Sequence, residues 1–277
     1  MKTLTPEKLV KRLEGLAPHP RVVAAGNFAT PHRLLELVDG NVETFTLHML
    51  NAQGEIPDRP GVTHETTFVG PAMRKSPALM YYPCRLSLTP VILRYQLPVD
   101  VLLLHTSTPR DGLVSMGVEV NILPAVLEAV RDRGGVVIAQ VNKQMPHTFG
   151  DGVVHVDDID YAIEVDEPLM THEPGEPDDI SKAIADHILR KIPDGATLQL
   201  GIGAVPDAVL GSLTSRRGLR IWSEMFSDGV LPLHELGAFD SEVPLTASFA
   251  FGSQRLYDWL DGNRRVRMRR TETTNAP

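Results

Sequence analysis

Two continuous apolar runs limit the folds open to this chain. Residues 99–105 and 136–141 are almost entirely aliphatic, as is typical of parallel strands buried on both faces. Between them, residues 123–132 have a helical pattern that ends at Gly134 and Gly135. A helix between two buried parallel strands is a βαβ unit, so this region predicts an α/β fold.

The same alternation begins near the N-terminus, where a strand at residues 21–25 leads through a glycine-containing loop into a helix at residues 32–38. Residues 164–178 are rich in proline and acidic residues, as a linker would be. We therefore predict two open α/β domains with mostly parallel sheets. Residues 1–170 form the N-terminal domain, and residues 171–277 form the start of a second, incomplete domain.

Composition excludes several classes of protein. The 277 residues are 42% hydrophobic and 22% charged, as in a globular protein. The net charge of −8 argues against binding to nucleic acid. A single cysteine, Cys84, cannot form an internal disulfide and fits a reducing compartment. Because no apolar run is long enough to span a membrane and no signal peptide is visible, we expect a cytoplasmic protein without membrane contact.

A glycine turn lies at the centre of the second domain. A strand at residues 196–200 is followed by Gly201 and Gly203, and we expect Pro206 to open a helix. Glycines let the backbone approach a ligand closely, and free N–H groups at the start of a helix attract anions. The residues predicted to bind the anionic substrate are Gly201, Ile202, Gly203, Ala204 and Val205.

Glu224 follows the next predicted strand, at residues 219–222. Open α/β sheets bind their ligands at the carboxyl ends of the strands, and Glu224 occupies such a position. Taken alone, each signal is weak. A glutamate after a strand is usually a solvated loop residue, and a Gly-x-Gly turn is usually only a tight connection.

The two motifs together are more specific. LQLGIGAVPDAV at residues 198–209 and SEMFSDGV at residues 223–230 closely resemble the acetyl-CoA hydrolase/transferase family, whose CoA-transferases act on acetate, butyrate, 4-hydroxybutyrate and related acids. Residues 107–118 and 141–160 resemble the N-terminal domain of that family. Its members continue well beyond the last residue here, so the resemblance implies that the C-terminal part is lacking.

The resemblance implies that Glu224 is the catalytic nucleophile of a CoA-transferase. Coenzyme A would pass from an acyl-CoA to a short-chain carboxylic acid by a ping-pong mechanism, through a glutamyl-CoA thioester. Acyl-CoA and the carboxylate are then substrates, and no cofactor is bound tightly. The resemblance also implies a homodimer or association with the missing C-terminal part.

Three further residues are candidate substrate contacts: Asn27, Asn142 and Gln144. For the last two, a structural role in a turn is equally open. The histidines show no metal-binding spacing, so no metal site is predicted.

Three other functions stay open. In an acyl-CoA hydrolase, water would intercept the glutamyl intermediate. The chain could also be an inactive fragment or subunit that needs a partner chain. In a nucleotide-binding regulatory domain that uses residues 201–206, the substitution Glu224→Ala would leave function intact.

Overall fold

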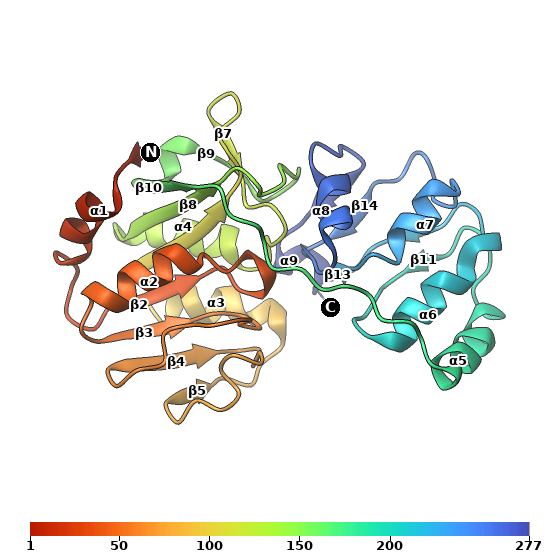
Figure 1. The fold of residues 1–277 in the computed structure, drawn as a ribbon, viewed down its shortest axis with the longest axis horizontal. Coiled ribbons are helices and arrows are strands. Elements are labelled where there is room, and N and C mark those ends of the chain that lie inside the picture. Colours follow the sequence, from red (N-terminus) through yellow and green to blue (C-terminus); the bar gives the residue numbers. More distant parts are fainter. Residues whose placement is uncertain (277) are drawn as a thin grey trace.

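The computed structural model describes residues 1–276, which form two lobes side by side (Figure 1). The N-terminal lobe is built on an eight-stranded sheet of order β1-β10-β8-β6-β2-β3-β4-β5, in which every neighbouring pair is parallel. Its strands are β1 (Lys2–Thr3), β2 (Arg21–Ala24), β3 (Phe45–His48), β4 (Val62–Thr66), β5 (Leu79–Tyr81), β6 (Val101–Thr106), β8 (Val136–Asn142) and β10 (Tyr161–Val165). The prediction of a parallel α/β fold is confirmed.

The apolar runs are explained by burial on both faces of this sheet. On β6, Val101 and Leu103 pack into one hydrophobic core, and Leu102 and Leu104 pack into another on the opposite face. Successive side chains of a strand point to opposite faces, so a strand between two cores has no polar side. Helices α1 (Pro6–Leu13) and α2 (His32–Asn41) cover the first face, and α3 (Thr89–Tyr95) and α4 (Leu123–Arg133) cover the second.

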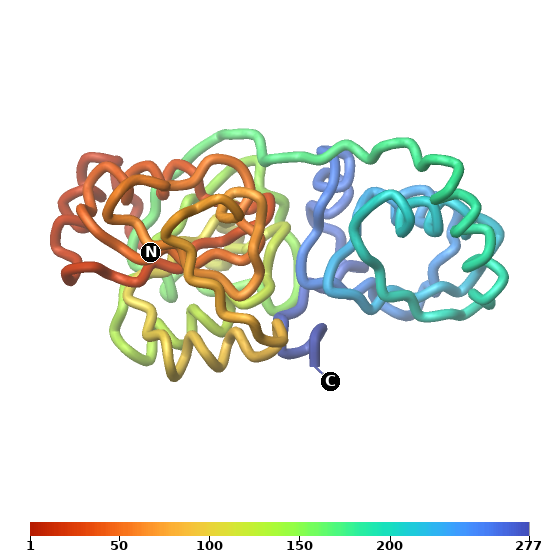
Figure 2. The backbone as a smooth tube through the Cα atoms, turned by 90° about the horizontal axis from the view of Figure 1, so that it is seen from below, coloured from red at the N-terminus to blue at the C-terminus, as the bar shows by residue number. Residues whose placement is uncertain are grey.

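A short antiparallel ribbon of β7 (Leu113–Ser115) and β9 (Val153–His155) extends from the same lobe. Residues 166–178 contain neither helix nor strand and run from the N-terminal lobe to the second lobe (Figure 2). Asp178 then caps α5 (Asp179–Leu189), accepting a hydrogen bond of 2.7 Å from the backbone N–H of Ser181. The residues with a linker-like composition therefore connect the two lobes.

The second lobe has short parallel strands. β11 pairs with β12, β14 with β16 and β13 with β15, and a parallel bridge between Trp222 and Thr246 joins β12 to β14. Its elements after α5 are β11 (Thr197–Leu198), α6 (Ala204–Ser212), β12 (Arg220–Ile221), β13 (Met225–Phe226), α7 (Val230–Glu235), β14 (Leu245–Ala247), β15 (Phe249–Ala250), α8 (Gln254–Leu260), β16 (Val266–Met268) and α9 (Thr271–Thr274).

Arginines after β16 fasten the lobes together. Arg269 forms an ion pair of 3.0 Å with Asp151 of the N-terminal lobe, and Arg270 forms one of 2.6 Å with Glu128 on α4. The backbone N–H of Arg270 also donates to Asp151. α9 consequently lies between the lobes (Figures 1 and 2). Within residues 1–276, we find no helix with the length and apolar character that crossing a membrane requires.

Two local features differ from the sequence-based expectations. The helix expected to open at Pro206 begins at Ala204, and Pro206 lies within its first turn, where a missing N–H is tolerated. The sequence of residues 245–251 (LTASFAF) also predicts one strand, but the structure interrupts it at Ser248. The interruption has a local cause: the N–H groups of Ser248 and Phe249 both donate to the backbone carbonyl of Glu224.

Candidate active site

The glycine turn and Glu224 are neighbours because β11 and β12 run parallel. The residues that follow the two strands therefore leave the sheet at the same edge. The side chain of Ser223 then joins them: its Oγ accepts a hydrogen bond of 2.9 Å from the N–H of Leu200 and donates one of 3.2 Å to the carbonyl of Leu200. Leu200 directly precedes the turn and Ser223 directly precedes Glu224, so this contact sets the spacing of the two motifs.

The turn presents free backbone N–H groups. Gly203 has a φ of 120° and caps the start of α6. Side chains other than hydrogen rarely tolerate that conformation. Within the described residues, none of the N–H groups of residues 201–205 donates to a protein acceptor. Since the start of a helix also carries partial positive charge, this turn is suited to hold an anion.

Glu224 is held at both its backbone and its side chain. It lies at a bend between β12 and β13, and its carbonyl accepts hydrogen bonds of 2.7 Å from Ser248 and 3.1 Å from Phe249. The half-buried carboxylate accepts a hydrogen bond of 2.7 Å from Nδ2 of Asn275. Thr274 donates from Oγ1 to the amide oxygen of Asn275 and so fixes which way that amide points.

A cavity of about 180 Å³ lies in front of Glu224, between the two lobes. Its lining residues are Asn27, Leu50, Asn51, Phe68, Leu86, Asn121, Gln199, Leu200, Gly201, Ile202, Glu224, Met225 and Phe249. The fold thus brings together four of the residues singled out in the sequence, namely Glu224, Gly201, Ile202 and Asn27. Val205 borders an adjacent apolar cavity of about 240 Å³, which Gly201 also lines. Gly203 and Ala204 complete the turn between Ile202 and Val205.

Three asparagines form a polar wall of this cavity: Asn27, Asn51 and Asn121. All three have left-handed backbone conformations, with φ values of 42°, 46° and 39°. Asn51 donates from Nδ2 to Oδ1 of Asn27 at 2.7 Å. Residues in this conformation often cluster at functional sites. Sequence reasoning missed Asn51, Asn121 and Asn275, because an asparagine in a loop is ordinary until the fold places it.

Asn142 and Gln144 lie away from this cavity. Asn142 is buried at the end of β8, where its Oδ1 accepts hydrogen bonds from the N–H groups of Gln144 and Glu167. Gln144 donates from its side chain to Asp166 at 3.0 Å. These are the bonds of a structural turn, the alternative role left open above.

His105 supports the loop that carries Asn27. Its Nδ1 lies 3.2 Å from the carbonyl of Ala29, and its Nε2 lies 3.1 Å from Nδ2 of Asn142. Burial lowers the pKa of His105 to about 4, so the ring is neutral at pH 7. The neutral ring donates from Nδ1 to Ala29 and accepts at Nε2 from Asn142, which fastens the loop to the ends of β6 and β8.

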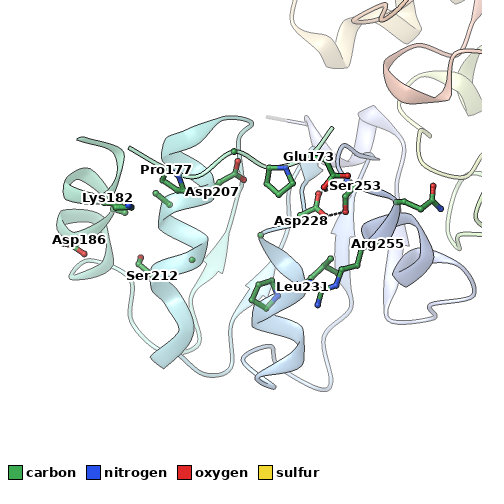
Figure 3. Close-up of a pocket in the computed structure, with 18 residues that line it drawn as sticks. Glu173, Pro177, Lys182, Asp186, Asp207, Ser212, Asp228, Leu231, Ser253 and Arg255 are labelled. Atoms are coloured by element: carbon green, nitrogen blue, oxygen red, sulfur yellow. Dashed lines mark hydrogen bonds between the residues drawn. The ribbon is translucent and has the colours of Figure 1, made fainter. Parts of the chain in front are cut away.

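A larger cavity lies elsewhere. A space of about 690 Å³ is bordered by the segment before α5 and by helices α5, α6, α7 and α8 (Figure 3). Its charged lining residues are Glu173, Lys182, Asp186, Asp207, Asp228 and Arg255. Four carboxylates against two cations disfavour an anionic ligand. Asp228 is also occupied by hydrogen bonds from Ser253 (Figure 3). The smaller cavity beside Glu224 is therefore the better candidate.

An α/β fold that sets a carboxylate beside a turn of free N–H groups is suited to an enzyme that handles acyl groups through that carboxylate. Comparison with known proteins identifies the family. Residues 44–172 match the model of the acetyl-CoA hydrolase/transferase N-terminal domain. The whole chain is 36% identical to the 4-hydroxybutyrate coenzyme A transferase of Clostridium kluyveri and covers 67% of it. The chain belongs to the acetyl-CoA hydrolase/transferase family.

Solved structures agree with this assignment. The 4-hydroxybutyrate CoA-transferase of Porphyromonas gingivalis superimposes with a TM-score of 0.82 and 30% identity, over 98% of this chain and 68% of that one. RipA from Yersinia pestis has the same fold, with a TM-score of 0.89 over 99% of this chain, at 22% identity. The chain spans about two thirds of the length of these relatives.

Proposed function

We propose that this protein is a CoA-transferase that moves coenzyme A from an acyl-CoA to a short-chain carboxylic acid, with Glu224 as the nucleophile. The observation that carries the proposal is the position of the Glu224 carboxylate, in the interlobe cavity that Gly201 and Ile202 of the free N–H turn also line. Membership of a family that includes CoA-transferases supports it.

In the first half-reaction, a carboxylate oxygen of Glu224 attacks the acyl-CoA carbonyl and the C–S bond breaks. This gives a mixed anhydride and the CoA thiolate. The thiolate then attacks the glutamyl carbonyl, and the donor acid leaves as its carboxylate. The enzyme now carries a glutamyl-CoA thioester. The acceptor carboxylate repeats these steps in reverse and restores Glu224, so no water or ATP is consumed.

The glycine turn supplies the electrostatic stabilisation that this chemistry needs. Each attack on a carbonyl creates an oxyanion, and a preorganised N–H donor at such a position contributes roughly 3–4 kcal/mol. Gly201 and Ile202 line the cavity, and the unpaired N–H groups of residues 201–205 are the candidate donors. The chain carries a net charge of −8, so binding of the anionic coenzyme requires local positive potential. The N-terminal end of α6 supplies it.

The size of the cavity favours a short acyl group. Its volume of about 180 Å³ equals that of roughly six water molecules in the liquid, at about 30 Å³ each. A short carboxylic acid fits such a space and a whole coenzyme A does not. The coenzyme would therefore extend outward past the exposed turn, with its thioester at Glu224 and Asn27 as a contact of the acyl group.

Two alternatives use the same site or its parts. An acyl-CoA hydrolase differs only in letting water reach the glutamyl thioester. An inactive subunit would need a partner chain to complete the site.

Label exchange separates the alternatives. Labelled acetate or butyrate is incubated with the unlabelled acyl-CoA, and both labelled acyl-CoA and free CoA are measured. A transferase gives exchange that depends on the acid, whereas a hydrolase releases free CoA without an acceptor. Glu224→Gln should abolish exchange, and Glu235→Gln, an exposed carboxylate in the same lobe, should not. Retention of exchange by Glu224→Gln would overturn the proposal. No exchange by a folded chain of monomeric mass would favour the partner-chain alternative.

A further inference from the structure

A second buried carboxyl lies behind the polar wall of the cavity. Glu119 is 1% exposed and does not itself line the cavity. Its Oε1 accepts a hydrogen bond of 3.2 Å from the N–H of Gly26 and one of 3.1 Å from Nδ2 of Asn121. Gly26 directly precedes Asn27, and Asn121 is a wall residue. Glu119 therefore contacts the wall from behind at two points.

The Gly26 contact is tightly constrained. A Cβ added at Gly26 would lie 1.9 Å from the carbonyl oxygen of Leu50, another lining residue. The backbone of Gly26 thus lies between the Glu119 side chain on one side and the backbone of Leu50 on the other. Asn27 follows in its left-handed conformation and accepts from Asn51. The position of Asn27 consequently depends on what holds Gly26.

Two polar atoms behind the wall have no hydrogen-bond partner among the described residues: Oε2 of Glu119 and Oδ1 of Asn121. Both are acceptors when Glu119 is ionised. Burying an unpaired carboxylate is very costly, whereas a proton on Oε2 makes that oxygen a donor. A proton on Oε2 of Glu119 would therefore remove at least one of the two unpaired acceptors behind the wall.

Among the described residues, the groups that shift the pKa of Glu119 are all uncharged. Burial raises its pKa to about 7, opposed only by the uncharged groups Asn121, Gly26 and Asn27. Glu65 is also a fully buried glutamate, but it pairs with Arg21 at 3.2 Å and with His48 at 3.0 Å. Burial works to raise the pKa of Glu65 too, but His48 and Arg21 overcome it and lower the pKa.

We propose that Glu119 is a positioning residue that works as a neutral carboxylic acid, holding Asn27 and Asn121 in the wall that faces Glu224. Loss of the Glu119 proton leaves a buried carboxylate with no cation beside it, and the contacts that hold Asn27 and Asn121 in place become weaker. Transfer activity then falls as Glu119 ionises. The test of this inference by transfer activity rests on the CoA-transferase function proposed above. The test by thermal stability does not depend on that function.

The activity test compares Glu119→Gln and Glu119→Ala with the wild type between pH 6 and pH 9. Glutamine copies the neutral acid, with one acceptor for Gly26 and an NH₂ donor. We expect Glu119→Gln to stay within about threefold of the wild type at pH 6 and to escape its alkaline decline, by the logic of perturbed pKa values. Glu119→Ala should lose roughly tenfold or more in kcat/KM at every pH. A Glu119→Gln profile that declines like the wild type, or a fully active Glu119→Ala, would overturn the inference.

The stability test is independent of activity. Because the pKa of Glu119 is raised on folding, its contribution is present below its ordinary pKa and is lost as pH rises through about 7. The Tm of Glu119→Gln should therefore exceed that of the wild type increasingly between pH 5 and pH 8.5, reaching about 5 °C. Glu65→Gln is the matched control and should lower Tm, since it breaks a buried ion pair.

The two tests separate the proposals. A Tm difference for Glu119→Gln that does not change with pH would contradict the neutral state of Glu119. If the difference widens but the wild type transfers no CoA, the neutral state stands and the proposed function fails. If the wild type transfers CoA and the Glu119 variants match it at every pH, only the positioning role fails.

Discussion

Asn275 donates a hydrogen bond of 2.7 Å from Nδ2 to Oε2 of Glu224, a residue 51 positions earlier in the chain. Asn275 directly follows α9, and that helix is held at its first residue, where the N–H of Thr271 donates to the carbonyl of Asn121 at 2.9 Å. The orientation of the proposed nucleophile therefore depends on α9, and α9 depends on a residue of the polar wall.

Replacing Asn275 should impair chemistry more than binding. Asn275→Ala removes a hydrogen bond to a charged group, worth roughly 1.5–3 kcal/mol, so we expect kcat to fall roughly 10- to 100-fold with a smaller change in KM. Steady-state kinetics of transfer measures both constants. Thr273→Ala, a half-buried position on the same helix, is the control and should leave kcat unchanged. An unimpaired Asn275→Ala would show that Glu224 needs no such support.

The link between Ser223 and Leu200 should matter for both stability and rate. Ser223→Ala leaves the half-buried N–H of Leu200 without its acceptor, which costs about 1 kcal/mol in the free energy of unfolding. It also releases the glycine turn from Glu224, and misplacement of this kind lowers kcat about tenfold or more. Chemical denaturation and transfer assays measure the two effects. Ser212→Ala removes a hydroxyl that donates to Val209 at the far end of α6, and a similar loss of kcat there would argue against this explanation.

Two glycines of the same region should respond to alanine in opposite ways. Gly203 has a φ of 120°, and alanine there costs roughly 1–2 kcal/mol and tilts the N–H groups of the turn, so transfer should fall. Gly211 lies inside α6 with open space around its Cβ position, so Gly211→Ala should stabilise the protein by about 0.5–1 kcal/mol. Thermal unfolding and transfer assays on both variants check this. Equal effects at the two positions would contradict the role given to the turn.

Acid should destabilise the N-terminal lobe through His105. Its pKa is lowered to about 4 on folding, so its contribution to stability is present above the ordinary value near 6.5 and is lost as pH falls from there through 4. The loss amounts to about 3 kcal/mol at most. Urea unfolding of the wild type and His105→Gln between pH 7 and pH 4 measures it. The gap between the two should shrink with acid, and a constant gap would count against a neutral buried ring.

Local patterns sufficed to predict the parallel sheet, whereas Glu224 and the glycine turn were singled out together because their two motifs resemble those of a known family. The aliphatic runs of β6 and β8 have no other simple explanation than burial on both faces. The interruption at Ser248 could not be predicted, because its cause is the carbonyl of Glu224 on another segment.

The other residues of the candidate site could not be predicted, because only the folded structure brings them together. Asn27, Asn51 and Asn121 come from three loops of the N-terminal lobe, whereas Glu224 and Asn275 come from the second part of the chain, so the cavity forms only where the two lobes meet. No local pattern in the sequence marks Glu119, and the role proposed for it rests on its burial behind the cavity. Such long-range contacts leave no periodicity in one sequence.

The most direct test of the central claim is the mass of the protein after incubation with acetyl-CoA or butyryl-CoA and then borohydride. Reduction of a glutamyl-CoA thioester releases CoA and leaves an alcohol, a loss of about 14 mass units from the carboxylic acid. We predict that peptide mapping places this loss on Glu224 and that Glu224→Gln abolishes it. A loss at another carboxylate, or an unmodified protein that nevertheless exchanges CoA, would contradict the assignment of Glu224 as the nucleophile.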